Sequence, residues 1–182
     1  MDSGQPVGPM GYSMRGVFNQ TWLLTWTTKG TWLPGDRRGW VSGAEFNAPD
    51  TASQAPSESL RNWCLNRMQA DPVWLNLEQA QAVLASLQET AKVQGWWLAA
   101  VAIMPNHVHV VVGGPNRVDG AKFLGRFKSY ASRGLNARWG KQNWWTENGS
   151  ARVLPDLDAI HSAMEYVANQ PGPLVLMIEK DR

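Results

Sequence analysis

The segment MPNHVHVVVGG, residues 104–114, decides the fold and raises the main functional question. Its run HVHVVV predicts a strand, and successive side chains of a strand point to opposite faces of a sheet. His107, His109 and Val111 therefore share one face, and the intervening valines share the other. The valine face belongs to a core, whereas the other face presents two imidazoles side by side.

Two further strands are predicted near the histidine segment. The apolar run WWLAAVAI at 96–103 precedes it, and only the three residues MPN separate the two runs, which predicts a tight antiparallel hairpin. Upstream, TWLLTWTT at 21–28 places Trp22, Leu24 and Trp26 on one face and the threonines on the other. This alternation is typical of a half-buried strand.

The other elements are predicted from helical periodicity and turn residues. Helices are expected at residues 59–68, 77–94, 120–139 and 156–170. Between the last two, NWWTENGSARVL predicts a short hairpin that turns at Asn148 and Gly149. The order strand, helices, two strands, helix, strand, helix predicts an α+β fold of the ferredoxin-like kind, an antiparallel sheet with helices packed mainly on one face.

Length and composition restrict the class of protein. With 182 residues and 43% hydrophobic content, the chain can bury the core of one domain. We expect a flexible lead at 1–20 and a single domain at 21–182, with a loop insertion rich in Gly, Pro, Ser, Asp and Ala at about 34–59. The single cysteine, Cys64, suits a reducing compartment. No leader or long apolar run is evident, which predicts a cytoplasmic protein without a membrane partner.

One apparent phosphate-binding motif is rejected. GTWLPGD at 30–36 has the glycine spacing of a P-loop, but Asp36 and Arg37 stand where lysine and a hydroxyl residue are required. A carboxylate at that position repels phosphates, so ATP hydrolysis is not expected.

The helix predicted at 156–170 has two different faces. Its apolar sector consists of Leu157, Ile160, Ala163, Met164, Val167 and Ala168. Tyr166 and Gln170 lie outside this sector and are neighbours one turn apart. A tyrosine that only filled the core would lie among the apolar residues. Tyr166 is therefore either an idle surface aromatic or a residue of a site.

The helix predicted at 120–139 carries charge of one sign. Lys122, Arg126 and Arg133 line the side opposite its apolar residues, with Lys128 and Arg138 flanking the apolar stripe. Asp119 is the only acid between Arg117 and Lys141. Such a stripe is either a solvated face or, close to the histidine strand, a track for phosphates.

Tryptophan is frequent, with 11 in the chain, although the net charge is only +2. Trp144 and Trp145, and in addition Trp32 or Trp40, are candidates for stacking on bases of a single strand. The ordinary alternative is that these rings fill the core or cover the sheet.

Together, MPNHVHVVV, a basic helix with FKSYASRGLN, the WWTENGS segment and a last helix with EYVANQ resemble the single-tyrosine HUH transposases of the IS200-like superfamily, in particular the REP-associated tyrosine transposases. The resemblance spans about 21–173. It implies a ferredoxin-like palm, a divalent metal, and a tyrosine that cuts single-stranded DNA and remains joined to the 5′-phosphate. Carried over by position, the metal ligands are His107, His109 and Gln170, and the nucleophile is Tyr166.

The resemblance also implies partners and surroundings. The substrate is expected to be single-stranded or hairpin DNA, and the protein to be bacterial and nucleoid-associated; whether it forms a homodimer stays open. Two imidazoles and an amide oxygen suit Mg²⁺ or Mn²⁺. Relatives often have an Asn-Pro pair directly after the last helix, whereas here Asn169, Gln170 and Pro171 follow one another, which leaves two amides as candidates for the third ligand.

Three alternatives stay open. Tyr130, between the basic and apolar sectors of its helix, is a second candidate nucleophile. The chain could be a domesticated DNA-binding protein that has lost cleavage. A metal-dependent hydrolase that uses water at the His107 and His109 pair is a third reading, but it lacks the carboxylate ligands that such sites usually recruit.

Overall fold

The computed structural model describes residues 20–37, 40, 54–115 and 118–179. Within these ranges the elements are β1 (Gln20–Thr27), α2 (Glu58–Asn66), α3 (Leu77–Gln94), β2 (Trp97–Ile103), β3 (His107–Gly114), α4 (Gly120–Trp139), β4 (Ser150–Leu154), α5 (Leu157–Ala168) and β5 (Val175–Ile178). Residues 1–19 of the expected lead, and 38–39 and 41–53 of the expected insertion, lie outside the described residues. Among the described helices, none is long and apolar enough to cross a membrane.

The described strands form one antiparallel sheet in the order β4-β1-β3-β2-β5. Each of α3 and α4 joins two strands that are separated in the sheet by a third strand, so two split βαβ units interlock. This arrangement confirms the predicted ferredoxin-like α+β fold. The sequence reading missed β5, a run of only four residues after a turn with two prolines, which adds to the edge of β2.

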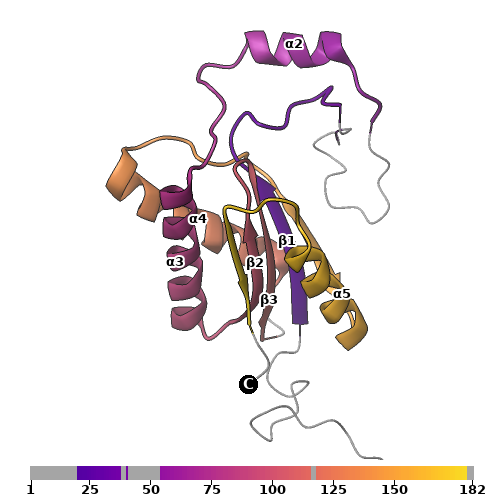
Figure 1. Ribbon diagram of the computed structural model, residues 1–182, viewed down its shortest axis with the longest axis vertical. Coiled ribbons are helices and arrows are strands. Elements are labelled where there is room, and N and C mark those ends of the chain that lie inside the picture. The colour runs from indigo at the N-terminus through magenta and orange to yellow at the C-terminus, as the bar shows by residue number, and fades with distance from the viewer. Residues whose placement is uncertain (1–19, 38–39, 41–53, 116–117, 180–182) are drawn as a thin grey trace, which may run out of the picture.

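Helices cover both faces of the sheet. α3 and α4 pack on one face, and α5 lies across the other, while α2 projects beyond the sheet and buries none of its residues (Figure 1). The alternation predicted for β3 is confirmed. Val108, Val110 and Val112 belong to the core under α3 and α4, and Val111 belongs to the smaller core under α5.

The hairpin between β2 and β3 is also confirmed. The main-chain nitrogen of Met104 donates to the carbonyl oxygen of His107 at 2.8 Å, which closes the three-residue connection. β3 then pairs with β1 so that Thr25 lies opposite His109 and Thr27 opposite His107. The two histidines are therefore the first and third residues of a central strand, at one end of the sheet.

The hairpin predicted around Asn148 and Gly149 is wrong. Trp145 forms a bridge with Thr28, the residue directly after β1, and Ser150–Leu154 then pair with β1 itself. Gly149 is needed because its backbone packs closely against β1 rather than because it forms a turn: a Cβ there would lie 2.8 Å from the carbonyl oxygen of Thr25. The whole segment is one irregular edge of the sheet.

Two glycine substitutions test this packing. We expect Gly149→Ala to lower the free energy of unfolding by roughly 1–3 kcal/mol, since its Cβ would also meet Leu124 Cδ2 at 2.9 Å. Gly125→Ala is the control, because it is exposed on α4 with no atom within 4 Å of the new Cβ. It should leave stability unchanged or raise it by up to about 1 kcal/mol. Urea unfolding measures both; equal effects would contradict the close approach at Gly149.

Candidate metal and tyrosine site

The two histidines of β3 lie next to each other on the face that α5 covers. Their ring centroids are 4.8 Å apart, with an interplanar angle of 83°. His109 is only 5% exposed, whereas His107, at the end of the strand, is half-buried. The pair therefore combines one deeply set imidazole with one nearer the solvent.

A polar neighbour holds each imidazole through Nδ1. The Thr25 hydroxyl lies 2.8 Å from His109 Nδ1, and the Asn106 side-chain oxygen lies 2.7 Å from His107 Nδ1. Since the amide oxygen of Asn106 can only accept, His107 Nδ1 donates, and the lone pair is on Nε2. Metal-binding histidines are usually oriented in this way, through the nitrogen that does not bind the metal. The pair thus fits a divalent metal, and Thr25, which the sequence did not single out, belongs to the same candidate site through its hydrogen bond to His109.

Helix α5 brings Tyr166 against the histidine pair of the same chain. The rings of Tyr166 and His109 lie 5.3 Å apart, edge to face at 79°. Ala163 and Val167 of α5 are buried against the sheet, while Tyr166 is 50% exposed. A buried histidine and a solvent-accessible phenol therefore share one site.

Gln170 follows α5 by two residues. Its amide nitrogen donates to the main-chain carbonyl oxygen of Tyr166 at 3.1 Å, which fixes the side chain at the end of the helix. Within the described ranges, no cluster of three or more His, Cys, Asp or Glu side chains could hold a metal. Among the described residues, Gln170 and Asn169 are the amides nearest to Tyr166 in sequence that could add an oxygen ligand to the two imidazoles.

Tyr130, the second candidate nucleophile, lies elsewhere. It is part of α4, on the opposite face of the sheet, and its ring lies 4.9 Å from the Arg133 guanidinium carbon. The structure therefore brings Tyr166, and not Tyr130, to the histidines.

The basic stripe of α4 also lies on the opposite face. Lys122, Arg126 and Arg133 are exposed, but α4 covers the valine face of β3. The stripe therefore lies on the opposite side of the histidine strand from the imidazoles, and its predicted phosphate contacts stay a prediction.

Two of the tryptophans expected to stack on bases, Trp144 and Trp145, are part of the core. Trp144 is 1% and Trp145 4% exposed. Their indole nitrogens donate to the side chain of Asn136 and to the carbonyl of Lys128, at 2.8 and 3.1 Å. Neither ring can receive a base in this structure, so the stacking prediction is corrected in favour of core packing.

Lys128 has a structural role as well. Its ammonium donates to the carbonyl oxygens of Thr146, Glu147 and Asn148 at 2.6, 3.0 and 3.0 Å. Burial lowers the pKa of Lys128 to about 8, although Glu147 opposes the shift. This side chain therefore holds the loop before β4, and its phosphate contact stays a prediction.

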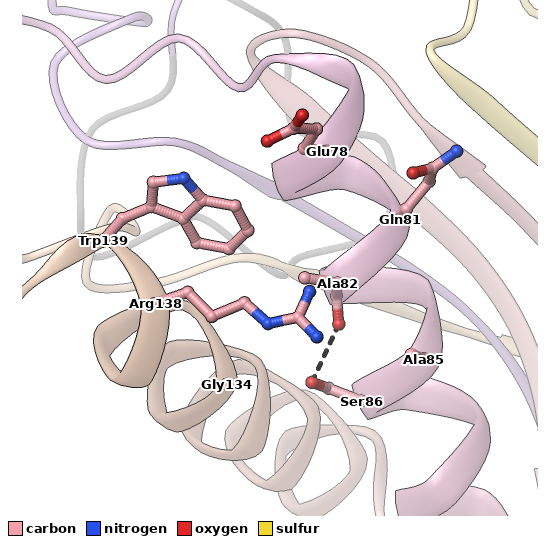
Figure 2. A pocket seen from close by; sticks show the side chains of 8 residues that line it. All are labelled: Glu78, Gln81, Ala82, Ala85, Ser86, Gly134, Arg138 and Trp139. Carbon is pink, nitrogen blue, oxygen red and sulfur yellow. Dashed lines mark hydrogen bonds between the residues drawn. The ribbon is translucent and has the colours of Figure 1, made fainter.

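A cavity of about 510 Å³ lies between α3 and α4, away from the histidines. Figure 2 shows the Arg138 side chain extending from α4 toward Ser86 of α3, with the Trp139 ring beside it. Ser86 itself donates to the carbonyl of Ala82 at 2.9 Å. The cavity belongs to the helix layer and shares no lining residue with the histidine site.

Comparison with known proteins identifies the family. The model of the family described as IS200-like transposases matches residues 67–170, more than half of the chain. The chain belongs to the IS200-like transposase family, which confirms the resemblance seen in the sequence. The matched segment contains His107, His109, Tyr166 and Gln170, whereas β1 lies before it.

Two solved structures are similar at low identity. One is a REP-associated tyrosine transposase bound to a REP hairpin, with 11% identity over 92% of this chain and 70% of that chain and a TM-score of 0.46. The other is a protein of Deinococcus radiodurans assigned as a transposase, with 18% identity over 93% of this chain and 98% of that chain and a TM-score of 0.46. No curated protein matches the chain.

The buried histidine is uncharged at neutral pH. Burial, and to a smaller extent the neighbouring His107, lowers the pKa of His109 from 6.5 to about 4. The unfolded chain therefore binds a proton between these values that the folded chain does not bind, so this group makes the fold less stable as the pH falls from about 6.5 to 4.

Histidine replacement tests this linkage. The free energy of unfolding should fall less in His109→Gln than in the unmodified chain when the pH is lowered from 7 to 4.5. The difference between the two falls should be about 2–3 kcal/mol. Urea unfolding at the two pH values measures the difference. His161→Gln, an exposed change on α5, is the control and should keep the full pH dependence. The same pH dependence in all three proteins would contradict the assignment.

Proposed function

We propose that this member of the IS200-like transposase family is a metal-dependent single-stranded DNA nuclease and strand transferase that acts through a 5′-phosphotyrosine intermediate. The observation that carries the proposal is the contact of Tyr166 with His109, at 5.3 Å between ring centroids, in a site where His107 is the second imidazole. Family membership over 67–170 supports the same chemistry.

In the proposed cleavage, the Tyr166 hydroxyl oxygen attacks the phosphorus of the scissile phosphodiester. A phosphorus–oxygen bond to tyrosine forms, the bond to the 3′ oxygen breaks, and the phenol loses a proton while the leaving 3′ oxygen gains one. The phosphate stays on Tyr166 as a diester. A free 3′-OH of another strand can then attack it and release the tyrosine, so strand transfer needs no ATP.

The residues around the tyrosine have supporting roles. His107 and His109 would bind the metal through Nε2, while Asn106 and Thr25 hold the rings by their Nδ1 atoms. Gln170, fixed one turn after Tyr166, is the proposed third ligand. A divalent ion here, Mg²⁺ or Mn²⁺, would neutralise an oxygen of the scissile phosphate and make the phosphorus easier to attack.

The proposed substrate is a DNA hairpin with a single-stranded flank. The resemblance of the histidine, basic-helix and tyrosine segments to REP-associated tyrosine transposases supports this substrate. The half-exposed ring of Tyr166 is consistent with it, since the attacking oxygen must reach an unpaired strand. Cleavage of chromosomal hairpins would place the protein at the bacterial nucleoid.

Tyrosine replacement separates the two candidate nucleophiles. Tyr166→Phe should bind a hairpin oligonucleotide with unchanged affinity and form no covalent adduct, because it lacks only the attacking oxygen. Tyr130→Phe, on the opposite face of the sheet, should still form the adduct. Denaturing electrophoresis with a labelled oligonucleotide detects the adduct.

Two outcomes would change this assignment. An adduct in Tyr166→Phe that disappears in Tyr130→Phe would make Tyr130 the nucleophile. Hairpin binding without an adduct from the unmodified protein, with Mg²⁺ and with Mn²⁺, would favour a domesticated DNA-binding protein.

Removal of one imidazole tests the metal role. His107→Ala should weaken Mn²⁺ binding at least tenfold and abolish adduct formation, because a neutral imidazole ligand is lost at a half-buried position. Calorimetric titration with Mn²⁺ in the absence of DNA measures binding separately from activity. His161→Ala removes the chain's third histidine from an exposed position on α5 and should change neither result. Unaltered Mn²⁺ binding by His107→Ala would contradict the role.

A further inference from the structure

Strand register places a second polar surface on the histidine face. Residues directly opposite one another on paired strands point to the same face of a sheet. Ser150 lies opposite Thr25, and Arg152 opposite Leu23. Since Thr25 contacts His109, and Leu23 belongs to the core under α5, Ser150 and Arg152 also point to the histidine face.

Helix α5 leaves this part of the sheet open. It begins three residues after Leu154, at the far end of β4, and the chain that follows it pairs with β2, so α5 crosses the sheet obliquely. Leu154 is buried beneath its beginning, whereas Ser150 and Arg152 are exposed at the histidine end of β4.

Two threonines extend the same surface. Thr27 lies opposite His107 and so shares its face. The Thr146 hydroxyl donates to the carbonyl oxygen of Thr28 at 3.1 Å and accepts from the Thr27 hydroxyl at 2.7 Å, so both hydroxyl protons are already used. Both side chains are half-buried. We call Thr27, Thr146, Ser150 and Arg152 the β1–β4 floor; the Arg152 guanidinium and the Ser150 hydroxyl are its donors for a phosphate, and the hydrogen-bonded threonine pair lies beside them.

The chemistry of this floor matches a nucleic-acid backbone. Arginine together with serine and threonine hydroxyls makes many of the phosphate contacts in protein–DNA complexes, and such contacts position the strand without reading bases. The acids nearest to Arg152 in sequence are Asp156, whose side chain accepts from the main-chain nitrogen of Ala159 at the start of α5, and Glu147, which lies in the loop whose carbonyls bind Lys128. The two strand spacings from β4 to β3 amount to about 10 Å, so phosphates adjacent to the scissile one can lie on the floor.

We propose that the β1–β4 floor holds the phosphate backbone of the single strand that leads to Tyr166, with Arg152 as its ion-pairing residue. This inference rests on the proposed function. It also places the strand being cut on the sheet face opposite the basic stripe of α4. Arg152, rather than that stripe, is then the proposed contact for the phosphates of this strand.

The test measures salt-dependent binding in the Tyr166→Phe background, so that cleavage does not interfere. Arg152→Gln should weaken binding of a fluorescent hairpin with a single-stranded flank severalfold. It should also reduce the slope of log affinity against log salt by about 0.7, the contribution of one phosphate contact to a single strand. Arg152→Lys should keep most of the slope. Arg138→Gln, a matched change at an exposed arginine beside the α3–α4 cavity, should leave the slope unchanged.

The outcomes separate this inference from the function on which it rests. The proposed role of the β1–β4 floor is overturned if Arg152→Gln leaves the affinity and the salt slope unchanged. It is also overturned if Arg138→Gln lowers both as much as Arg152→Gln does. Either result counts even if the unmodified protein forms its adduct. Absence of an adduct from the unmodified protein would instead overturn the proposed cleavage. A hairpin without the single-stranded flank provides a further check, because it should bind with equal affinity to Arg152→Gln and to the protein that keeps Arg152. If Arg152→Gln weakens binding of this hairpin as much as it weakens binding of the flanked one, the assignment to the single strand is overturned.

Discussion

The pairing of β1 with β3 is the constraint on which the site depends. It sets Thr25 opposite His109, and the resulting 2.8 Å hydrogen bond fixes the orientation of the buried imidazole. A slip of one residue would turn every side chain of β3 to the other face of the sheet. The imidazoles would then enter the core, and the valines that hold α3 and α4 would lie under α5. Core packing and site geometry are therefore specified by the same register.

The sequence predicts best what depends on strict periodicity. The two faces of β3 follow from its alternation, and the position of Tyr166 outside the apolar sector of α5 follows from the helical period; the structure agrees with both. Helix α4 begins and ends where expected, since Asp119 caps it and the apolar stripe continues to Leu135.

Features that depend on tertiary pairing were not accessible in this way. Asn148 and Gly149 have the composition of a turn, but the glycine is needed for a close approach to Thr25. Because the sequence predicts a hairpin there, it does not show which face of the sheet Arg152 occupies. Trp144 and Trp145 also illustrate the limit, since nothing local distinguishes an aromatic ring that is exposed from one that fills a core. Their burial in the core beside α4 shows that both fill it.

The position of β1 has a consequence for how such a domain can be exchanged between genes. The segment matched by the family, 67–170, encodes the imidazoles, the phenol and the carboxamide, yet the strand that separates β3 from β4 lies before it. A recombination event that transferred only this segment would move these proposed reactive groups without Thr25, 84 residues upstream of His109, and without the central strand of the sheet. The recipient would have to supply a compatible strand in the same register. Inheritance of the candidate site is therefore tied to a stretch of sequence that contains none of its proposed reactive groups.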